Sequence, residues 1–169
     1  MRGPSEIVVT AWARLVRAQR AVMAGIEGEL KQAGFPPLSW YDVLLELKRR
    51  PDGRLTPREL EQEMLFEQYN LSRLLDRMEA EGLLRRTPYP GDKRRQLIEI
   101  TDDGRSLQKR IWPVYAAAIE RYVGSKLTES EVQVLAEALK KLLAADENES
   151  ARPLAKKQSA TSASDDRVF

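Results

Sequence analysis

The sequence predicts a mainly helical α+β fold, with about six helices and one β-hairpin in the order helix, helix, helix-turn-helix, hairpin, helix, helix. Three observations predict this order. Apolar residues recur at helical spacing in long segments at both ends of the chain. In the middle, two short helical segments are separated by only about residues 65–67, and a turn rich in Pro and Gly then separates two strand-like stretches. With 169 residues, the chain is most simply one domain that buries a real core.

The composition excludes several kinds of chemistry. There is no Cys and no His, so disulfides, thiol redox sensing, His general bases and Cys/His zinc sites are excluded. No phosphate-binding Gly-rich loop occurs and the acidic residues are scattered, which predicts no catalytic residues, no cofactor and no metal site. No apolar run approaches the ~20 residues of a membrane helix, and no signal-peptide-like segment follows the first six residues. We therefore expect a soluble, cytoplasmic protein that is not an enzyme.

The first helix is expected over about residues 6–33, followed by a shorter second one. Gly34 and the Pro36–Pro37 pair end the first helix. Ser39 is predicted to cap the second, and the turn at residues 51–53 ends it. The apolar stripe of the first helix consists of Val8, Trp12, Leu15, Val22, Ile26 and Leu30.

The two central helices carry clear start and stop signals. Thr56 and Glu59 form a predicted capping box, with Pro57 at the first helical position. The second helix of the pair ends at Gly82. Its buried side is predicted to be Leu71, Leu74, Leu75 and Met78. A β-hairpin follows at about residues 84–100, although the adjacent Leu97 and Ile98 interrupt the alternation expected of a strand.

The C-terminal part is predicted to hold two more helices. Thr101 caps a long helix that reaches about Val123, and Pro113 should kink it. Thr128 and Glu131 form a second capping box, which opens a helix with an apolar side. After about residue 145 the periodicity stops, so residues 146–169 are predicted to be a disordered tail.

The central motifs resemble the MarR (multiple antibiotic resistance regulator) family. The resemblance rests on the run from Leu60 to Arg86, on Asp92-Lys93-Arg94 and on the segment from Ile100 to Gly104. It covers roughly residues 6–145 and implies a MarR-like domain at 1–145. Within it, about 38–100 form a winged helix-turn-helix with the wing at 84–100, and about 6–33 and 102–145 are dimerisation helices.

The chain departs from the family pattern in the first motif helix. Glu61 stands where the family has a small residue, and Leu65 stands where it has a turn glycine. The helix is also acidic, and carboxylates facing a duplex would repel its phosphates. We therefore expect these groups to face away from DNA or to pair with Arg58 and Arg73. The acidic residues concerned are Glu59, Glu61, Glu63 and Glu67.

The second motif helix has a polar face suited to the major groove. Asn and Gln can pair with adenine and Arg with guanine, while Ser72 and Arg77 can equally bind phosphate. The alternative is a solvated polar face. The predicted DNA-binding residues of this helix are Gln68, Tyr69, Asn70, Ser72, Arg73 and Arg77.

The hairpin is strongly basic. Residues 84–97 carry five cationic side chains against Asp92 alone, a net charge of +4 in a chain whose net charge is +2. A basic tip suits the narrow minor groove. The family pattern implies that Arg94 inserts there and that Asp92 shapes the turn; Lys93 and Arg95 complete the predicted contacts. A solvated loop is the alternative. Residues 48–50 either add phosphate contacts or are an ordinary solvated helix end.

The terminal helices have apolar faces that predict a shared interface, with core packing as the alternative. The candidates are Trp12, Leu15, Tyr115, Tyr122, Leu135, Leu139 and Leu142. The resemblance implies a homodimeric repressor that binds double-stranded DNA at a near-palindromic operator and is relieved by a small aromatic or anionic effector. The expected ligand-binding residues are Trp12, Arg14, Arg17, Trp40, Tyr41 and Trp112, with core packing as the alternative for each aromatic. The rival hypothesis is a winged-helix protein-interaction module without DNA binding, which the acidic helix would suit.

Overall fold

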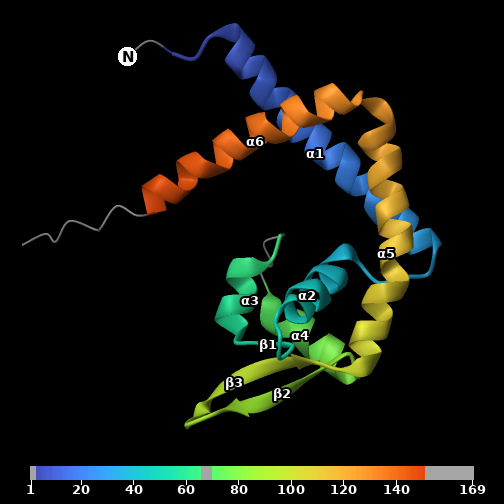
Figure 1. The fold of residues 1–169 in the computed structure, drawn as a ribbon, viewed down its shortest axis with the longest axis vertical. Helices are drawn as coiled ribbons and strands as arrows, with labels where there is room; N and C mark the ends of the chain where they lie inside the picture. Colours follow the sequence, from blue (N-terminus) through green and yellow to red (C-terminus); the bar gives the residue numbers. More distant parts are fainter. Residues whose placement is uncertain (1–2, 66–69, 151–169) are drawn as a thin grey trace, which may run out of the picture. The chain divides into compact units, whose positions relative to one another are not determined.

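The structure is a computed structural model that describes residues 3–65 and 70–150 (Figure 1). The chain divides into two compact units, Met1–Lys126 and Leu127–Phe169. The first unit contains the helices α1 (Glu6–Gln32), α2 (Leu38–Arg49), α3 (Pro57–Glu63), α4 (Leu71–Ala80) and α5 (Asp102–Tyr122), with the strands β1 (Arg54–Leu55), β2 (Leu84–Tyr89) and β3 (Asp92–Ile100). A short 3₁₀ turn, Gly124–Lys126, ends it. The second unit contains α6 (Glu129–Ser150).

The predicted mainly helical fold is confirmed, with one element that the sequence did not suggest. The described residues form six α-helices and an antiparallel sheet in the order β1-β3-β2. The strand β1 pairs Arg54 with Glu99 and Leu55 with Ile98. Two residues are too few to show a strand periodicity. Because β2 is an edge strand, Pro88 removes no ladder hydrogen bond that the sheet needs, and the register shifts between Pro88 and Tyr89.

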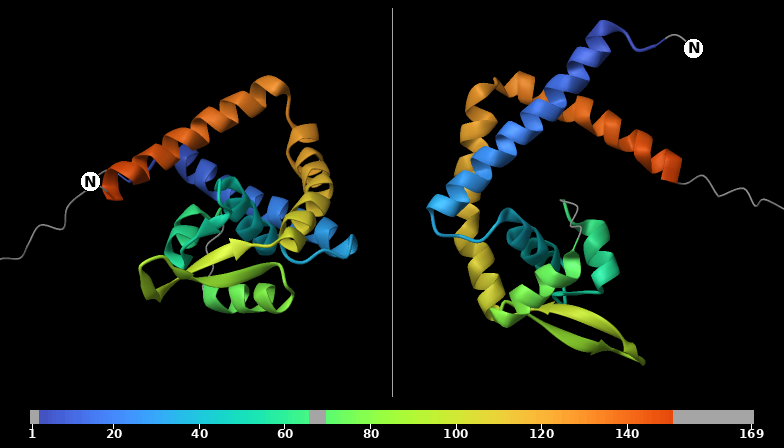
Figure 2. Two further views of the ribbon diagram at one scale, coloured as in Figure 1. Left: turned by 60° about the horizontal axis from the view of Figure 1, so that its bottom comes forward. Right: turned by 180° about the vertical axis from the view of Figure 1, so that it is seen from behind.

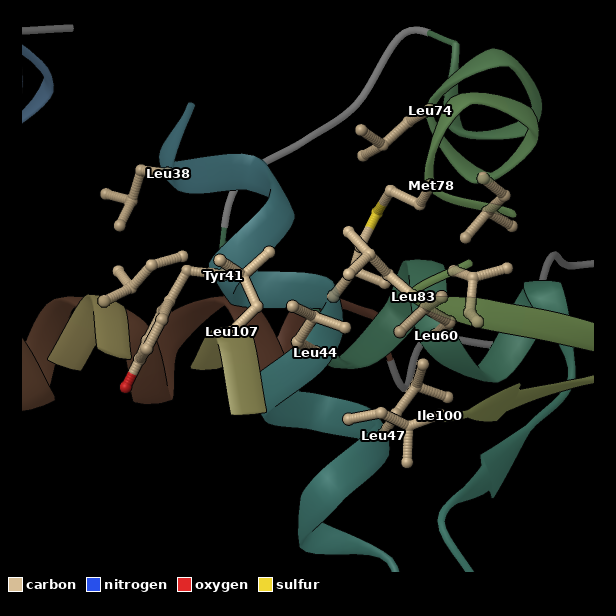
Figure 3. Close-up of a cluster of buried hydrophobic side chains, with 14 of the residues drawn as sticks. Leu38, Tyr41, Leu44, Leu47, Leu60, Leu74, Met78, Leu83, Ile100 and Leu107 are labelled. Atoms are coloured by element: carbon tan, nitrogen blue, oxygen red, sulfur yellow. The ribbon is translucent and has the colours of Figure 1, made fainter. Parts of the chain in front are cut away.

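The core of the first unit is built around α2 (Figure 3). Leu44 and Leu47 are fully buried and face Met78 of α4 and Ile100 of β3. Ile98 and Ile100 alternate with the partly exposed Leu97 and Glu99, so β3 keeps a regular strand alternation despite its adjacent apolar residues. This packing fixes the sheet, and with it the β2–β3 hairpin, against the helices.

The C-terminal half of α1 packs on α5, whereas its N-terminal half is exposed. Gly25 lets the ring of Tyr122 lie directly on the helix backbone, since a Cβ there would meet the ring at 2.5 Å. The Tyr122 hydroxyl donates to Glu29 Oε1 at 3.2 Å, and Arg121 Nη1 donates to the same oxygen at 2.5 Å. By contrast, Trp12 is 66% exposed. The apolar stripe predicted for this helix is therefore buried within the unit only towards its C-terminal end.

Most of the predicted helix starts are confirmed. Thr56 and Glu59 form the expected capping box, Thr101 Oγ1 accepts from the Gly104 N–H, and Thr128 and Glu131 form reciprocal hydrogen bonds. The Ser39 cap was wrong, because α2 begins at Leu38 and Pro37 holds the N-cap position, so Ser39 is already inside the helix. Its first N–H is satisfied from α1, where Glu27 Oε1 accepts from the Leu38 N–H at 3.0 Å.

Two helices extend through positions where the sequence suggested a disturbance or an end. The helix α5 is continuous through Pro113. The helix α6 runs to Ser150, beyond the boundary near residue 145. Residues 151–169, most of the predicted tail, lie outside the described part of the chain.

Candidate nucleic-acid interface

The helix α4 has one buried side and one polar side, as its sequence predicted. Leu71, Leu74, Leu75 and Met78 pack into the core. Ser72, Arg73 and Arg77 are exposed, together with Asp76. Two predicted contacts, Gln68 and Tyr69, lie outside the described residues. The exposed side therefore holds two arginines and a serine that can reach a bound molecule.

Asn70 performs a structural task at the start of α4. It is the N-cap residue, and its Oδ1 accepts from the Arg73 N–H at 3.3 Å. Bidentate pairing with adenine uses both the oxygen and the nitrogen of an amide side chain. In this geometry the cap uses the oxygen, which leaves the NH₂ group as the part of Asn70 that can donate to another molecule.

The hairpin of β2 and β3 projects beyond the helices of the first unit (Figure 2). Its tip turns at Gly91, whose φ of 83° favours glycine. Beside it, Asp92 Oδ1 accepts from the Arg94 N–H at 3.0 Å. Arg94 is 95% exposed, and its Nε lies 3.6 Å from the same oxygen, a separation too long to hold the side chain in place. Arg94 therefore extends from the tip as a long, exposed cation.

Arg95 lies on the strand just behind the tip. Its guanidinium carbon is 4.3 Å from the centre of the Tyr89 ring, which is the geometry of a cation–π contact across the hairpin. The ring restricts the side chain but leaves its N–H donors unpaired with any carboxylate among the described residues. The side chain of Lys93, the third predicted cation of the tip, lies outside the description.

At the base of the hairpin, Glu99 of β3 offsets the positive charge of Arg85 and of Arg54 on β1. Arg85 donates to Glu99 Oε1 at 2.7 Å, and Arg54 Nη2 lies 3.2 Å from the other oxygen, Oε2. The hydrogen bond from Arg85 is the main reason that the pKa of Glu99 is lowered, followed in effect by Arg54. Glu99 Oε2, the oxygen beside Arg54, is buried. It accepts no hydrogen bond among the described residues, so its contact with Arg54 is an ion pair only.

Arg86 joins the hairpin to α4. Its guanidinium donates to Asp76 Oδ1 at 2.6 Å and also to Glu79 Oε2. The Arg86 N–H donates to the second oxygen of Glu79, Oε1, at 3.0 Å. Arg86 thus fixes the hairpin to the polar helix instead of contributing free charge. The net charge of +4 counted along residues 84–97 overestimates what the hairpin presents, because these partners lie outside that segment.

Of the two alternatives expected for the acidic residues, pairing with Arg58 or Arg73 does not occur among the described residues, and Glu67 lies outside them. Glu59 pairs with its own cap, where its Oε2 accepts from the Thr56 N–H and hydroxyl at 2.8 and 2.6 Å. These hydrogen bonds are the main cause of its lowered pKa. Glu63 instead accepts from Arg50 at 2.8 Å.

The basic residues at the end of α2 are also engaged within the fold. Lys48 donates to Gln108 Oε1 at 2.7 Å and Arg49 to Glu46 Oε1 at 2.7 Å. With Arg50 paired to Glu63, all three cations have internal partners. These internal partners favour the second of the two alternatives, in which residues 48–50 are an ordinary helix end that makes no phosphate contacts.

Two of the residues expected to bind a ligand lie together between α2 and α5. Tyr41 and Trp112 stack with ring centres 6.3 Å apart, and Tyr115, which the ligand prediction missed, approaches Tyr41 edge-on at 5.1 Å. Tyr41 is 3% exposed and Trp112 49%. Burial is the main cause of the raised pKa of Tyr41, whose hydroxyl accepts from Gln108 Nε2 at 3.1 Å.

The other expected ligand residues are not part of this aromatic cluster. Trp12, Arg14 and Arg17 are exposed on α1, and Trp40 is partly buried. None of the ring contacts among residues 3–65 and 70–150 joins Trp12 or Trp40 to Tyr41. The sequence could not separate these aromatics, because their spacing alone does not show which ones share a side of the fold.

The described part of the chain holds no group of three or more His, Cys, Asp or Glu side chains that could bind a metal ion. None of its helices has an apolar stretch long enough to span a bilayer.

Comparisons with known proteins agree on one family. The family model described as MarR family matches residues 33–95. The multiple antibiotic resistance protein MarR of Salmonella typhimurium is 33% identical over 91 residues, which cover 54% of this chain and 63% of that protein. The chain thus matches less than two thirds of the length of this curated relative.

Solved structures match over more of the chain. The regulator AbsC of Streptomyces coelicolor, of the MarR family, has a TM-score of 0.76 and 22% identity, covering 88% of this chain and 99% of its own. This likeness shows the fold. A second MarR family regulator from Streptomyces coelicolor, solved in complex with DNA, has a TM-score of 0.76 and 25% identity, covering 85% of this chain and 89% of its own.

Proposed function

Since the chain belongs to the MarR family of winged-helix transcriptional regulators, which are not enzymes, we propose that it is a homodimeric, cytoplasmic repressor that binds double-stranded DNA at a near-palindromic operator. The observation that carries the proposal is that α4 and the β2–β3 hairpin lie in one compact unit. The polar side of α4 suits a major groove, and the hairpin with the exposed Arg94 suits the adjacent minor groove. Arg86 holds the two elements together.

The experiment that tests DNA binding is a titration of the protein with the duplex upstream of its own gene. Affinity should fall steeply with rising salt, since bound cations release counterions from the phosphates. An unrelated duplex of equal length should bind more weakly at every salt concentration. Weak binding without preference for either duplex would contradict the regulator proposal.

The dimer proposal rests on apolar side chains that neither unit buries. Both α1 and α6 carry several large apolar side chains that are exposed to solvent. Exposed apolar side chains that occur in groups mark an interaction surface. They include Ile7, Val8, Val9 and Trp12 on α1, and Val134, Leu135, Leu142 and Leu143 on α6. Two copies would place two α4 helices on successive half-sites. Light scattering should give a mass near twice 19.3 kDa.

We further propose that a small aromatic or anionic effector relieves repression. The cluster of Tyr41, Trp112 and Tyr115 supports this, because α2 belongs to the winged-helix core and α5 leads away from it. A ligand that inserts beside the half-exposed Trp112 would favour a spacing of the two α4 helices of the dimer that is unsuited to DNA. Quenching of Trp112 fluorescence, lost in Trp112→Phe, would locate binding there.

The second candidate function is a winged-helix protein-interaction module without DNA binding. It is favoured by α3, where Glu61 is exposed and has no ion pair among the described residues. Such a module would show no preference for its upstream duplex. The same titration therefore distinguishes the two candidates.

The two roles of Asn70 can be separated by substitution. Aspartate caps a helix as well as asparagine, so Asn70→Asp should leave the free energy of unfolding nearly unchanged, whereas Asn70→Ala should lower it by about 1 kcal/mol. Aspartate cannot donate to adenine and repels phosphate, so Asn70→Asp should weaken DNA binding about tenfold or more. Urea unfolding and duplex titration measure the two effects. Unchanged DNA binding by Asn70→Asp would show that Asn70 acts only as a cap.

A further inference from the structure

Two adjoining depressions lie between the start of α3 and β3, and they share Pro57, Arg58 and Gln96. The larger, of about 590 Å³, extends to Arg95 on β3. The smaller, of about 310 Å³, extends to Ser72 on α4. Because they share three residues, they form one continuous depression, here named the α3 furrow, which runs from α4 to the hairpin.

The position of the furrow determines what would cross it on a duplex. Ser72, at one end, belongs to the helix proposed for the major groove, and Arg95, at the other end, belongs to the hairpin proposed for the minor groove. Neighbouring grooves of a duplex are separated by one sugar–phosphate strand. A protein that occupies both grooves with these two elements must place that strand over the surface between them.

The furrow contains hydrogen-bond donors that no other part of the fold uses. Arg58 and Gln96 are both exposed, and among the described residues neither forms an ion pair or a side-chain hydrogen bond. Arg86, which also lines the smaller depression, is different, since Asp76 and Glu79 already bind it. Arg58 and Gln96 can therefore donate to an incoming anion without breaking an internal contact.

Two carboxylates line the furrow, and they decide where the anion can lie. Glu59 stays charged, but the Thr56 N–H and hydroxyl occupy its Oε2. Glu61 lines only the smaller depression, towards α4. The larger depression has two cations, Arg58 and Arg95, against Glu59 as the one carboxylate in its lining, so a phosphate is favoured on the side of the hairpin.

We propose that the α3 furrow binds the sugar–phosphate strand between the two grooves, with Arg58 and Gln96 donating to its phosphates. This inference rests on the proposed DNA binding and adds two positioning residues to it. Contacts to phosphate fix the register of a protein on the duplex and read no sequence. Arg58 and Gln96 should therefore strengthen binding to every duplex equally.

The test is Arg58→Ala in the full chain, titrated with the upstream duplex and with an unrelated duplex of equal length over a range of salt concentrations. Affinity should fall about tenfold for both duplexes. The slope of log affinity against log salt should become smaller by about 0.9 for each protomer that loses Arg58. Gln96→Ala should weaken binding to both duplexes without changing the slope of log affinity against log salt, because glutamine carries no charge. Arg58→Lys should restore the slope, and Arg110→Ala, an exposed arginine of α5 that lines neither depression, is the matched control.

The outcomes separate this inference from the proposed function. If the wild-type protein binds neither duplex in a salt-dependent way, both fail. If it binds and Arg58→Ala keeps the wild-type slope, only the furrow is overturned. A loss confined to the upstream duplex would also overturn it, because it would make Arg58 a base-reading residue. Equal thermal unfolding of Arg58→Ala and wild type shows that the fold is intact.

Discussion

Arg94→Ala is expected to lower the affinity for the upstream duplex by at least about tenfold, which is the effect of losing a hydrogen bond to a charged group. The side chain is 95% exposed at the hairpin tip and its only ion-pair partner among the described residues is Asp92, at 3.6 Å. It therefore gives up no strong internal contact when it enters a minor groove, where the negative potential is greatest. The measurement is a duplex titration at several salt concentrations, with a smaller salt slope expected for the variant.

The matched control lies in the same hairpin. Arg85→Ala removes the same charge, but Arg85 is already bound to Glu99 at the hairpin base. Its loss should change the affinity much less than the loss of Arg94. Equal losses for the two variants would mean that the duplex responds only to the summed charge of the hairpin, and the specific role of Arg94 would be abandoned.

Features set by neighbouring residues could be predicted from the sequence. The capping boxes at Thr56 and Thr128 depend on residues three positions apart, and the structure forms both. The buried side of α4 follows from helical spacing in the same way. Gly82 ends α4 with a φ of 72°, a conformation that glycine adopts without strain.

Contacts between distant residues could not be predicted. Arg86 meets Glu79 only because β2 turns back along α4, and Arg85 meets Glu99 only because of the hairpin register. A charge count along the chain treats both arginines as free. The same reason explains the Ser39 cap: the sequence offers a local acceptor, whereas the fold supplies Glu27 from another helix. Arg58 and Gln96 were missed as site residues because their proximity depends on the packing of α3 beside β3.

Gly104, near the start of α5, has little room for a side chain. A Cβ there would meet the backbone oxygen of Leu83, and it would lie 3.0 Å from Ile100 Cγ1 and 3.1 Å from Leu44 Cδ2. The Leu83 oxygen cannot move aside freely, because it accepts from the Thr101 N–H at 3.2 Å. Gly104→Ala must therefore displace α5 from the hairpin base or distort the backbone at Leu83.

Gly104→Ala is accordingly expected to lower the free energy of unfolding by about 3 kcal/mol, the cost of overpacking against backbone. This exceeds the gain of about 1 kcal/mol from replacing glycine by alanine within a helix. The control is Gly28→Ala in α1, where a Cβ meets nothing within 4 Å; it should stabilise the protein by about 0.5–1 kcal/mol. Urea unfolding of both variants at one protein concentration measures the difference, since dimer formation would couple stability to concentration. If Gly104→Ala were as stable as Gly28→Ala, the close packing of α5 on the hairpin base would be wrong, and with it the rigid connection between α5 and the hairpin.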